Sequence, residues 1–148
     1  MKRNRNPKGS LHKHSLSLGS LAVVVLLIVL YRRSNPYAHI GAFFGNAIAD
    51  WTGVLTTVVM TKHLYEKGSA ESKQPRGSVR SAAVEWLREH SLTLFLLVTG
   101  IAWVVACKAM DPNSKWGQVV GNIVSEWTQI LGLVLMTKRM MEVGSKAR

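Results

Sequence analysis

One stretch of this sequence occurs twice: Gly45-Asn46-Ala47-Ile48-Ala49-Asp50-Trp51-Thr52 returns, 76 positions later, as Gly121-Asn122-Ile123-Val124-Ser125-Glu126-Trp127-Thr128. Between residues 35 and 69, 14 of 35 positions are identical to their counterparts without a gap. The same offset aligns residues 14–18 with residues 90–94. Self-similarity at a fixed offset indicates a repeated structural unit, here of two apolar segments. Each copy holds one acid inside an apolar run, Asp50 or Glu126, and these acids are the main candidate functional residues.

The apolar residues, 47% of 148, gather in four long runs. Two of them, residues 15–31 and 91–107, contain no charged residue. A transmembrane helix needs about 20 predominantly apolar residues. We therefore expect an all-α membrane protein with four transmembrane helices, arranged as two tandem, parallel-repeat helical hairpins. The expected parts are a basic cytoplasmic tail (1–13), a first hairpin repeat (14–69), a cytoplasmic linker with an interfacial helix (70–89) and a second hairpin repeat (90–148).

The basic residues are distributed unevenly along this four-span path. The tail, the central loop and the C-terminal segment together carry 15 Lys and Arg residues, whereas the two short connections carry 4. Cytoplasmic loops carry such an excess, so both termini are expected in the cytoplasm. The two hairpins then have the same orientation in the membrane. The net charge of +11 is expected to contact anionic lipid and no nucleic acid, because no aromatic residue interleaves the charges of the tail.

The second helix of each unit has a recognisable start. Asn35-Pro36 and Asp111-Pro112 match an N-cap residue followed by proline at the first helical position. We expect these helices to run over residues 36 to about 65 and 112 to about 141. Residues 66–78 form the linker, and residues 79–90 have the helical spacing of an amphipathic segment that continues into the third span.

Polar side chains form a stripe along the second helix of each unit. Asn46, Asp50 and Thr57 share one face of the first copy, and Asn122, Glu126 and Gln129 share one face of the second. A stripe of small residues lies beside them. Small residues at every fourth position allow helices to approach closely, so this stripe is expected to serve helix packing and self-association. It comprises Gly41, Gly45, Gly53, Gly117, Gly121 and Ser125.

Both acids are expected deep in the membrane. Asp50 is 12 residues from Lys62, and Glu126 is 12 residues from Lys138; this is roughly 18 Å along a helix. No basic residue occurs within the apolar part of any expected span. A buried, unpaired carboxylate costs several kcal/mol, so it must be protonated, face water or hold a cation. Three interpretations of the acids follow: they are protonated and serve helix packing, they form a cation or proton site, or they lie in an outer aqueous vestibule.

The leading hypothesis is a homo-oligomeric cation or proton channel. Asp50 and Glu126 would attract the cation, and four neutral side chains would supply further oxygen ligands: Asn46, Asn122, Thr57 and Gln129. The alternative is a non-catalytic membrane scaffold or accessory subunit whose acids only fix helix packing. No catalytic motif is present, so we expect neither an enzyme nor a cofactor. The expected partners are the lipid bilayer, further copies of the chain and a small cation.

Two segments resemble a known family. Gly68-Ser69-Ala70-Glu71-Ser72-Lys73 and Asn122-x-x-Ser125-Glu126-Trp127-x-Gln129 are similar to segments of small bacterial four-helix membrane proteins classed as a domain of unknown function. The similarity covers the second helix of each unit, about a third of the chain. That family has a further acid where this chain has Ile48 and Val124, so a pair of acids within one helix is not implied. The resemblance implies a multi-pass protein of the bacterial inner membrane and no mechanism.

Overall fold

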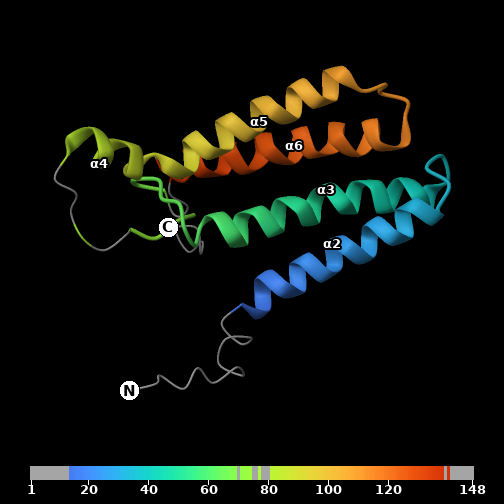
Figure 1. Cartoon of the computed structure of the whole chain (residues 1–148), viewed down its shortest axis with the longest axis horizontal. Coiled ribbons are helices and arrows are strands. Elements are labelled where there is room, and N and C mark those ends of the chain that lie inside the picture. Colours follow the sequence, from blue (N-terminus) through green and yellow to red (C-terminus); the bar gives the residue numbers. More distant parts are fainter. Residues whose placement is uncertain (1–13, 70, 75–76, 78–80, 139, 141–148) are drawn as a thin grey trace, which may run out of the picture.

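The computed structural model describes residues 14–69, 71–74, 77, 81–138 and 140. This part of the chain is all-helical and contains five helices, shown in Figure 1. They are α2 (Ser15–Arg33), α3 (His39–Met60), α4 (Ala82–Glu89), α5 (Ser91–Ala109) and α6 (Lys115–Met136). The predicted basic tail, residues 1–13, lies outside the described residues.

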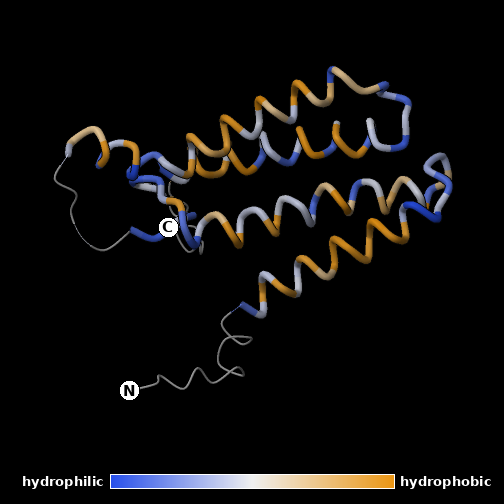
Figure 2. The backbone as a smooth tube through the Cα atoms, viewed as in Figure 1, coloured by the Kyte–Doolittle hydropathy of each residue, from blue (hydrophilic) through white to orange (hydrophobic). Residues whose placement is uncertain are grey.

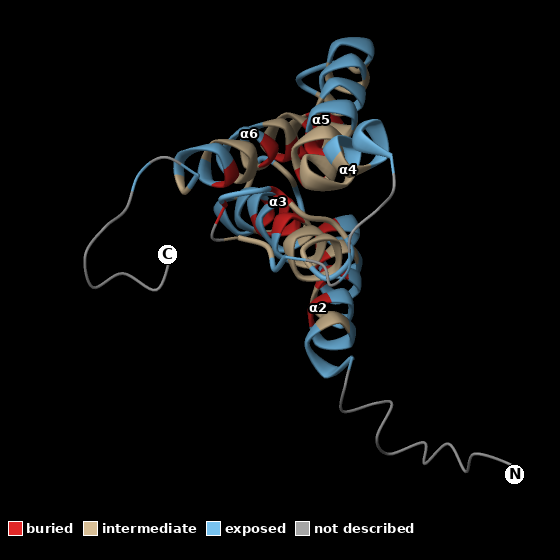
Figure 3. Cartoon of the chain, turned by 90° about the vertical axis from the view of Figure 1, so that its left-hand side faces the viewer, coloured by how far each residue is buried: buried red, intermediate tan, exposed pale blue. Residues whose placement is uncertain are grey.

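The four long helices form two hairpins, α2–α3 and α5–α6. The main contacts join α2 to α3, α3 to α6 and α6 to α5. In Figure 1, α3 and α6 run side by side in the same direction, and in the end view of Figure 3 they separate α2 from α5. Helices α3 and α6, the second helix of each hairpin, therefore form the centre of the molecule.

Three helices are long and apolar enough to cross a membrane: α2, α5 and α6. Their apolar side chains are largely exposed; on α5, for example, Val98 and Ile101 are two-thirds exposed. Figure 2 shows that apolar residues extend along most of α2 and α5. Such continuous apolar surface is characteristic of contact with lipid. Helix α3 matches α6 in length but is not among the three. Asn46, Asp50 and three threonines interrupt its apolar residues.

The start of α3 differs from the prediction. Asn35 does not cap the helix; its Oδ1 accepts a hydrogen bond from the backbone N–H of Tyr37 at 3.0 Å, and α3 begins only at His39. The side chain of Asp111 accepts equivalently from Asn113 at 2.9 Å. These bonds make turns that compete with helix at Asn and Asp. The prolines therefore lie in turns that precede the helices.

Serine takes the capping role in the second hairpin. Ser114 Oγ accepts a hydrogen bond from the N–H of Gly117 at 3.0 Å, at the first turn of α6. A Cβ atom at Gly117 would overlap the carbonyl oxygen of Asp111, and one at Gly41 would overlap that of Asn35. Gly41 and Gly117 are therefore needed for the turns to fold back on the helices.

Gly45 and Gly121 lie where the helices of each hairpin meet. A Cβ at Gly45 would lie 3.2 Å from the ring of Tyr31 on α2, and one at Gly121 would lie 4.0 Å from Cys107 Sγ on α5. The Tyr31 side chain is buried, and its hydroxyl donates to the backbone oxygen of Lys115. Gly45 is thus buried in packing within the protomer, whereas Gly121 is half-buried beside Cys107.

The other ends of α3 and α6 also differ from the prediction. These helices end at Met60 and Met136, about five residues before the predicted ends. The amphipathic lead-in is a separate helix, α4, because the backbone at His90 leaves helical geometry (φ −118°, ψ 13°). Its exposed apolar side chains include Val84 and Trp86, which fits a helix at the membrane surface. Residues 79 and 80 of the predicted segment lie outside the described residues.

Candidate functional site

The central pair of helices carries a polar pocket. It has a volume of about 240 Å³ and is lined by Asn46 and Asp50 of α3 and by Asn122, Ser125 and Glu126 of α6. Both acids lie about midway along their 22-residue helices. The parallel packing of α3 against α6 brings the two acid-containing stripes to one face.

The two amides of the pocket bond directly to one another. Asn122 Nδ2 donates to Asn46 Oδ1, and these residues stand at equivalent positions of the sequence repeat. A second contact of this kind lies nearer the helix starts, where the Tyr37 hydroxyl donates to the carbonyl oxygen of Asn113 at 3.2 Å. Contacts between equivalent positions fix the relative height of α3 and α6. They therefore place Asp50 opposite Glu126.

Gly53 makes room for the acid of the opposite helix. A Cβ at Gly53 would lie 3.3 Å from Glu126 Oε2 and 3.3 Å from Ile130 Cδ1, tighter than ordinary van der Waals contact. Gly53 is buried, and its counterpart in the repeat is Gln129. The small residue is therefore present only on α3, where it lets the α6 carboxyl group approach.

Asp50 and Glu126 line the same pocket. Two carboxylates at short range repel, so a proton or a cation between them stabilises the pair. No Lys, Arg or His is among the described residues that line the pocket. No group of three or more His, Cys, Asp or Glu that could hold a metal occurs in the described part of the chain. The pocket thus offers two carboxyl groups, two amides and one hydroxyl to a small cation or proton.

Two of the predicted ligands lie elsewhere. Thr57 lines a separate small cavity with Leu92 and Leu96 of α5, and Gln129 is exposed and does not line the polar pocket. Ser125, predicted to serve helix packing, is exposed at the pocket.

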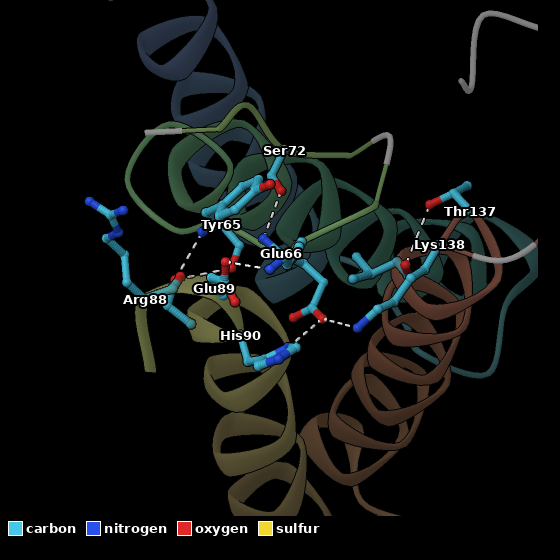
Figure 4. Close-up of polar contacts among 11 residues, drawn as sticks. Tyr65, Glu66, Ser72, Arg88, Glu89, His90, Thr137 and Lys138 are labelled. Atoms are coloured by element: carbon cyan, nitrogen blue, oxygen red, sulfur yellow. Dashed lines mark hydrogen bonds and ion pairs between the residues drawn. The ribbon is translucent and has the colours of Figure 1, made fainter. Parts of the chain in front are cut away.

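A second polar cluster, which the sequence analysis missed, lies at the end of the bundle where α3 and α6 finish. Glu66 follows α3, and its side chain is only 1% exposed. Its Oε1 accepts from Lys138 Nζ at 2.8 Å and from His90 Nδ1 at 2.8 Å, as Figure 4 shows. The cluster joins the segment after α3 to the start of α5 and to the segment after α6.

Backbone bonds hold the segment around Glu66 in place. Its own N–H donates to Ser72 Oγ at 2.9 Å, and the N–H of Lys67 donates to the carbonyl oxygen of Glu89 at 2.7 Å. Ser69 is buried, and its hydroxyl lies 3.0 Å from Thr137 Oγ1. The linker is therefore an ordered connection between the hairpins over these residues.

The charge of Glu66 is stabilised by its neighbours. Burial alone would raise the pKa of Glu66, but the side chains of Lys138, Thr93 and His90 outweigh it and hold that pKa below its usual range. Neither the Thr93 hydroxyl nor Glu66 Oε2 has a hydrogen-bond partner among the described residues, so the bonds from Lys138 and His90 are the ones that the geometry supports. The carboxylate is therefore ionised, and its main function is to hold three chain segments together.

The repeat contained a sign of this cluster. His90 and Lys138 are the counterparts of His14 and Lys62, and Glu66 is identical to its own counterpart, Glu142. These three polar residues lie outside the apolar runs, yet each is identical to its counterpart 76 positions away. Such identity is not expected of an ordinary linker.

Comparison with known proteins adds no relative. No protein-family model, curated protein or solved structure matches this chain.

Proposed function

We propose that the protein is a homo-oligomeric, multi-pass membrane protein that forms a cation or proton channel around Asp50 and Glu126. The observation that carries this proposal is the polar pocket at mid-height of the central helices. Intramembrane carboxyl groups are costly and commonly serve ion or proton movement. We also propose that the protein lies in the bacterial inner membrane with both termini in the cytoplasm.

The proposed architecture has four spans in two parallel hairpins, related by a two-fold axis between α3 and α6. Its support is the contact of positions 76 apart: Asn46 with Asn122 and Tyr37 with Asn113. A residue meets its own counterpart only near such an axis. With α3 as the fourth span, its polar residues lie beside α6, and its acid lines the polar pocket.

Self-association would complete the site. Asn46, Asp50 and Ser125 are exposed on one protomer, and a bilayer cannot solvate such a face without high cost. A second copy laid against α3 and α6 would remove these groups from lipid and double the number of carboxyl groups. The resulting enclosed polar path would suit an ion that exchanges between several ligands.

The proposal is tested with purified protein in liposomes, by fluxes of K⁺, Na⁺ and H⁺. Asp50→Asn combined with Glu126→Gln removes the attracting charge at nearly constant volume, so flux should fall at least tenfold. Asp111→Asn is the matched control, because it removes one acid from a turn in which the first hairpin already has Asn35. Flux that is equal in wild type and the double variant would contradict a role of these acids in conduction.

A scaffold function is favoured by one observation, the direct bond between Asn46 and Asn122. If the acids likewise only lock α3 to α6, the oligomeric wild type conducts none of the three ions. The double variant then keeps the thermal stability of the wild type, since an amide offers a donor and an acceptor in the place of a protonated acid. That combination of results would replace the channel by the scaffold.

A further inference from the structure

The first hairpin carries a pair of basic side chains at the same end of the bundle as the Glu66 cluster. Lys62 Nζ lies 3.0 Å from Nδ1 of His14, which directly precedes α2. Both residues are exposed. An ammonium group has no acceptor, so Lys62 Nζ donates to His14 Nδ1 in this contact. The other N–H groups of the ammonium and Nε2 of the imidazole remain to bind one anionic group.

The second hairpin shows what this pair of residue types binds. His90 and Lys138 stand 76 positions after His14 and Lys62. Both place a nitrogen 2.8 Å from the same oxygen of Glu66. One histidine and one lysine at equivalent places in the repeat thus already hold an oxyanion in this molecule.

The first pair lacks such an oxyanion among the described residues. The ion pairs of the described chain involve Glu66, Glu85 and Glu89, and none of them includes His14 or Lys62. Lys62 lines an open hollow of about 310 Å³, whose charged residues are Lys62, Lys73 and Glu71. The hollow has a net positive charge and the hydroxyl groups of Thr61 and Ser72, which suits an anionic group.

The geometry points to an oxyanion site at His14 and Lys62, and we propose that its ligand is the phosphate of an anionic lipid headgroup. The apolar surface beside the pair supports a lipid. Leu16 and Leu18, on the first turn of α2, are 67% and 46% exposed. A lipid whose phosphate contacts His14 would lay its acyl chains along this part of α2.

The test uses full-length protein in an uncharged detergent and measures binding of phosphatidylglycerol by native mass spectrometry and thermal shift. Neutralising one basic contact at a membrane surface weakens binding about fivefold. We therefore expect His14→Gln with Lys62→Gln to weaken phosphatidylglycerol binding at least fivefold, and Lys62→Arg to preserve it. The matched control, His39→Gln with Lys108→Gln, makes the same changes at the opposite end of the bundle and should bind as wild type does.

Further arms separate the sources of the oxyanion. Phosphatidylcholine should give no shift, and a shift with inorganic phosphate alone would assign the site to a free oxyanion. Glu142, the counterpart of Glu66, lies outside the described residues; tighter lipid binding by Glu142→Gln than by wild type would assign the oxyanion to the chain itself. Equal effects of phosphatidylglycerol and phosphate on wild type and on the His14, Lys62 double variant, together with no effect of Glu142→Gln, would overturn the proposal.

Discussion

Replacing Glu66 by glutamine should destabilise the protein although no apolar contact is lost. The variant keeps the shape of the side chain but removes the charge that accepts hydrogen bonds from Lys138 and His90. Losing one partner of a buried ion pair costs about 3–5 kcal/mol. The side chains of Lys138 and His90 are 32% and 25% exposed, so water can recover part of their solvation. We therefore expect a loss of about 2 kcal/mol.

The assay is unfolding in detergent, followed by far-UV circular dichroism across a denaturant series. Glu89→Gln is the matched control, because Glu89 pairs at 2.7 Å with Lys67, whose side chain is 61% exposed. An exposed pair contributes about 0–1 kcal/mol. If Glu66→Gln and Glu89→Gln lower the free energy of unfolding equally, the Glu66 cluster does not hold the hairpins together.

The contribution of Glu66 should also depend on pH. Its pKa is lower in the folded protein than the ordinary value of 4.5, so folding favours the ionised form. Its stabilising effect is therefore complete above about pH 4.5 and is lost as the pH falls through the folded pKa. The difference in unfolding free energy between wild type and Glu66→Gln should shrink over that acidic range. A difference that is constant down to pH 3 would refute the assigned charge state.

Two further predictions concern packing and topology. Gly45→Leu with Gly121→Leu should lower the melting temperature strongly, because both glycines face the partner helix of their own hairpin. Gly132→Leu is the control and should be tolerated, since nothing lies within 4 Å of its Cβ position. An unchanged melting temperature of the double variant would place both glycines on a free surface. Reporter domains inserted near Gln74 and fused after Arg148 should both be cytoplasmic, and a periplasmic signal from either would contradict the four-span proposal.

The sequence predicted the apolar helices well and their polar ends poorly. The expected spans 15–31 and 91–107 lie within α2 and α5, which extend two residues further, because charged or polar residues bound those apolar runs. The starts of α3 and α6 were predicted three residues early. A side-chain hydrogen bond at Asn35 or Asp111 can serve a turn as well as a cap, and the residue type alone does not distinguish them.

Helical spacing was sufficient to predict that Asn46 and Asp50 share a pocket, but not to predict where the pocket ends. Asn46 and Asp50, four residues apart, share a face of α3 and do line the pocket. Gln129 is three residues after Glu126, which turns it roughly 60° away around α6, and it is exposed. Thr57 lies two turns beyond Asp50, where α3 faces the cavity that α5 also lines. A stripe predicts a shared direction, whereas only the packing of neighbouring helices decides where a pocket ends.

The molecule uses its acids in two ways, and their partners account for the difference. Glu66 is more deeply buried than Asp50 or Glu126, but Lys138 and His90 supply the positive charge that its carboxylate needs. Asp50 and Glu126 line one pocket with two amides and no basic side chain among the described pocket residues. In the proposed channel, their compensating charge would come from outside the protomer, as a proton or a cation. A group that exchanges its counter-charge with the surroundings is suited to transport, while one that carries its counter-charge within the fold is suited to holding the hairpins together.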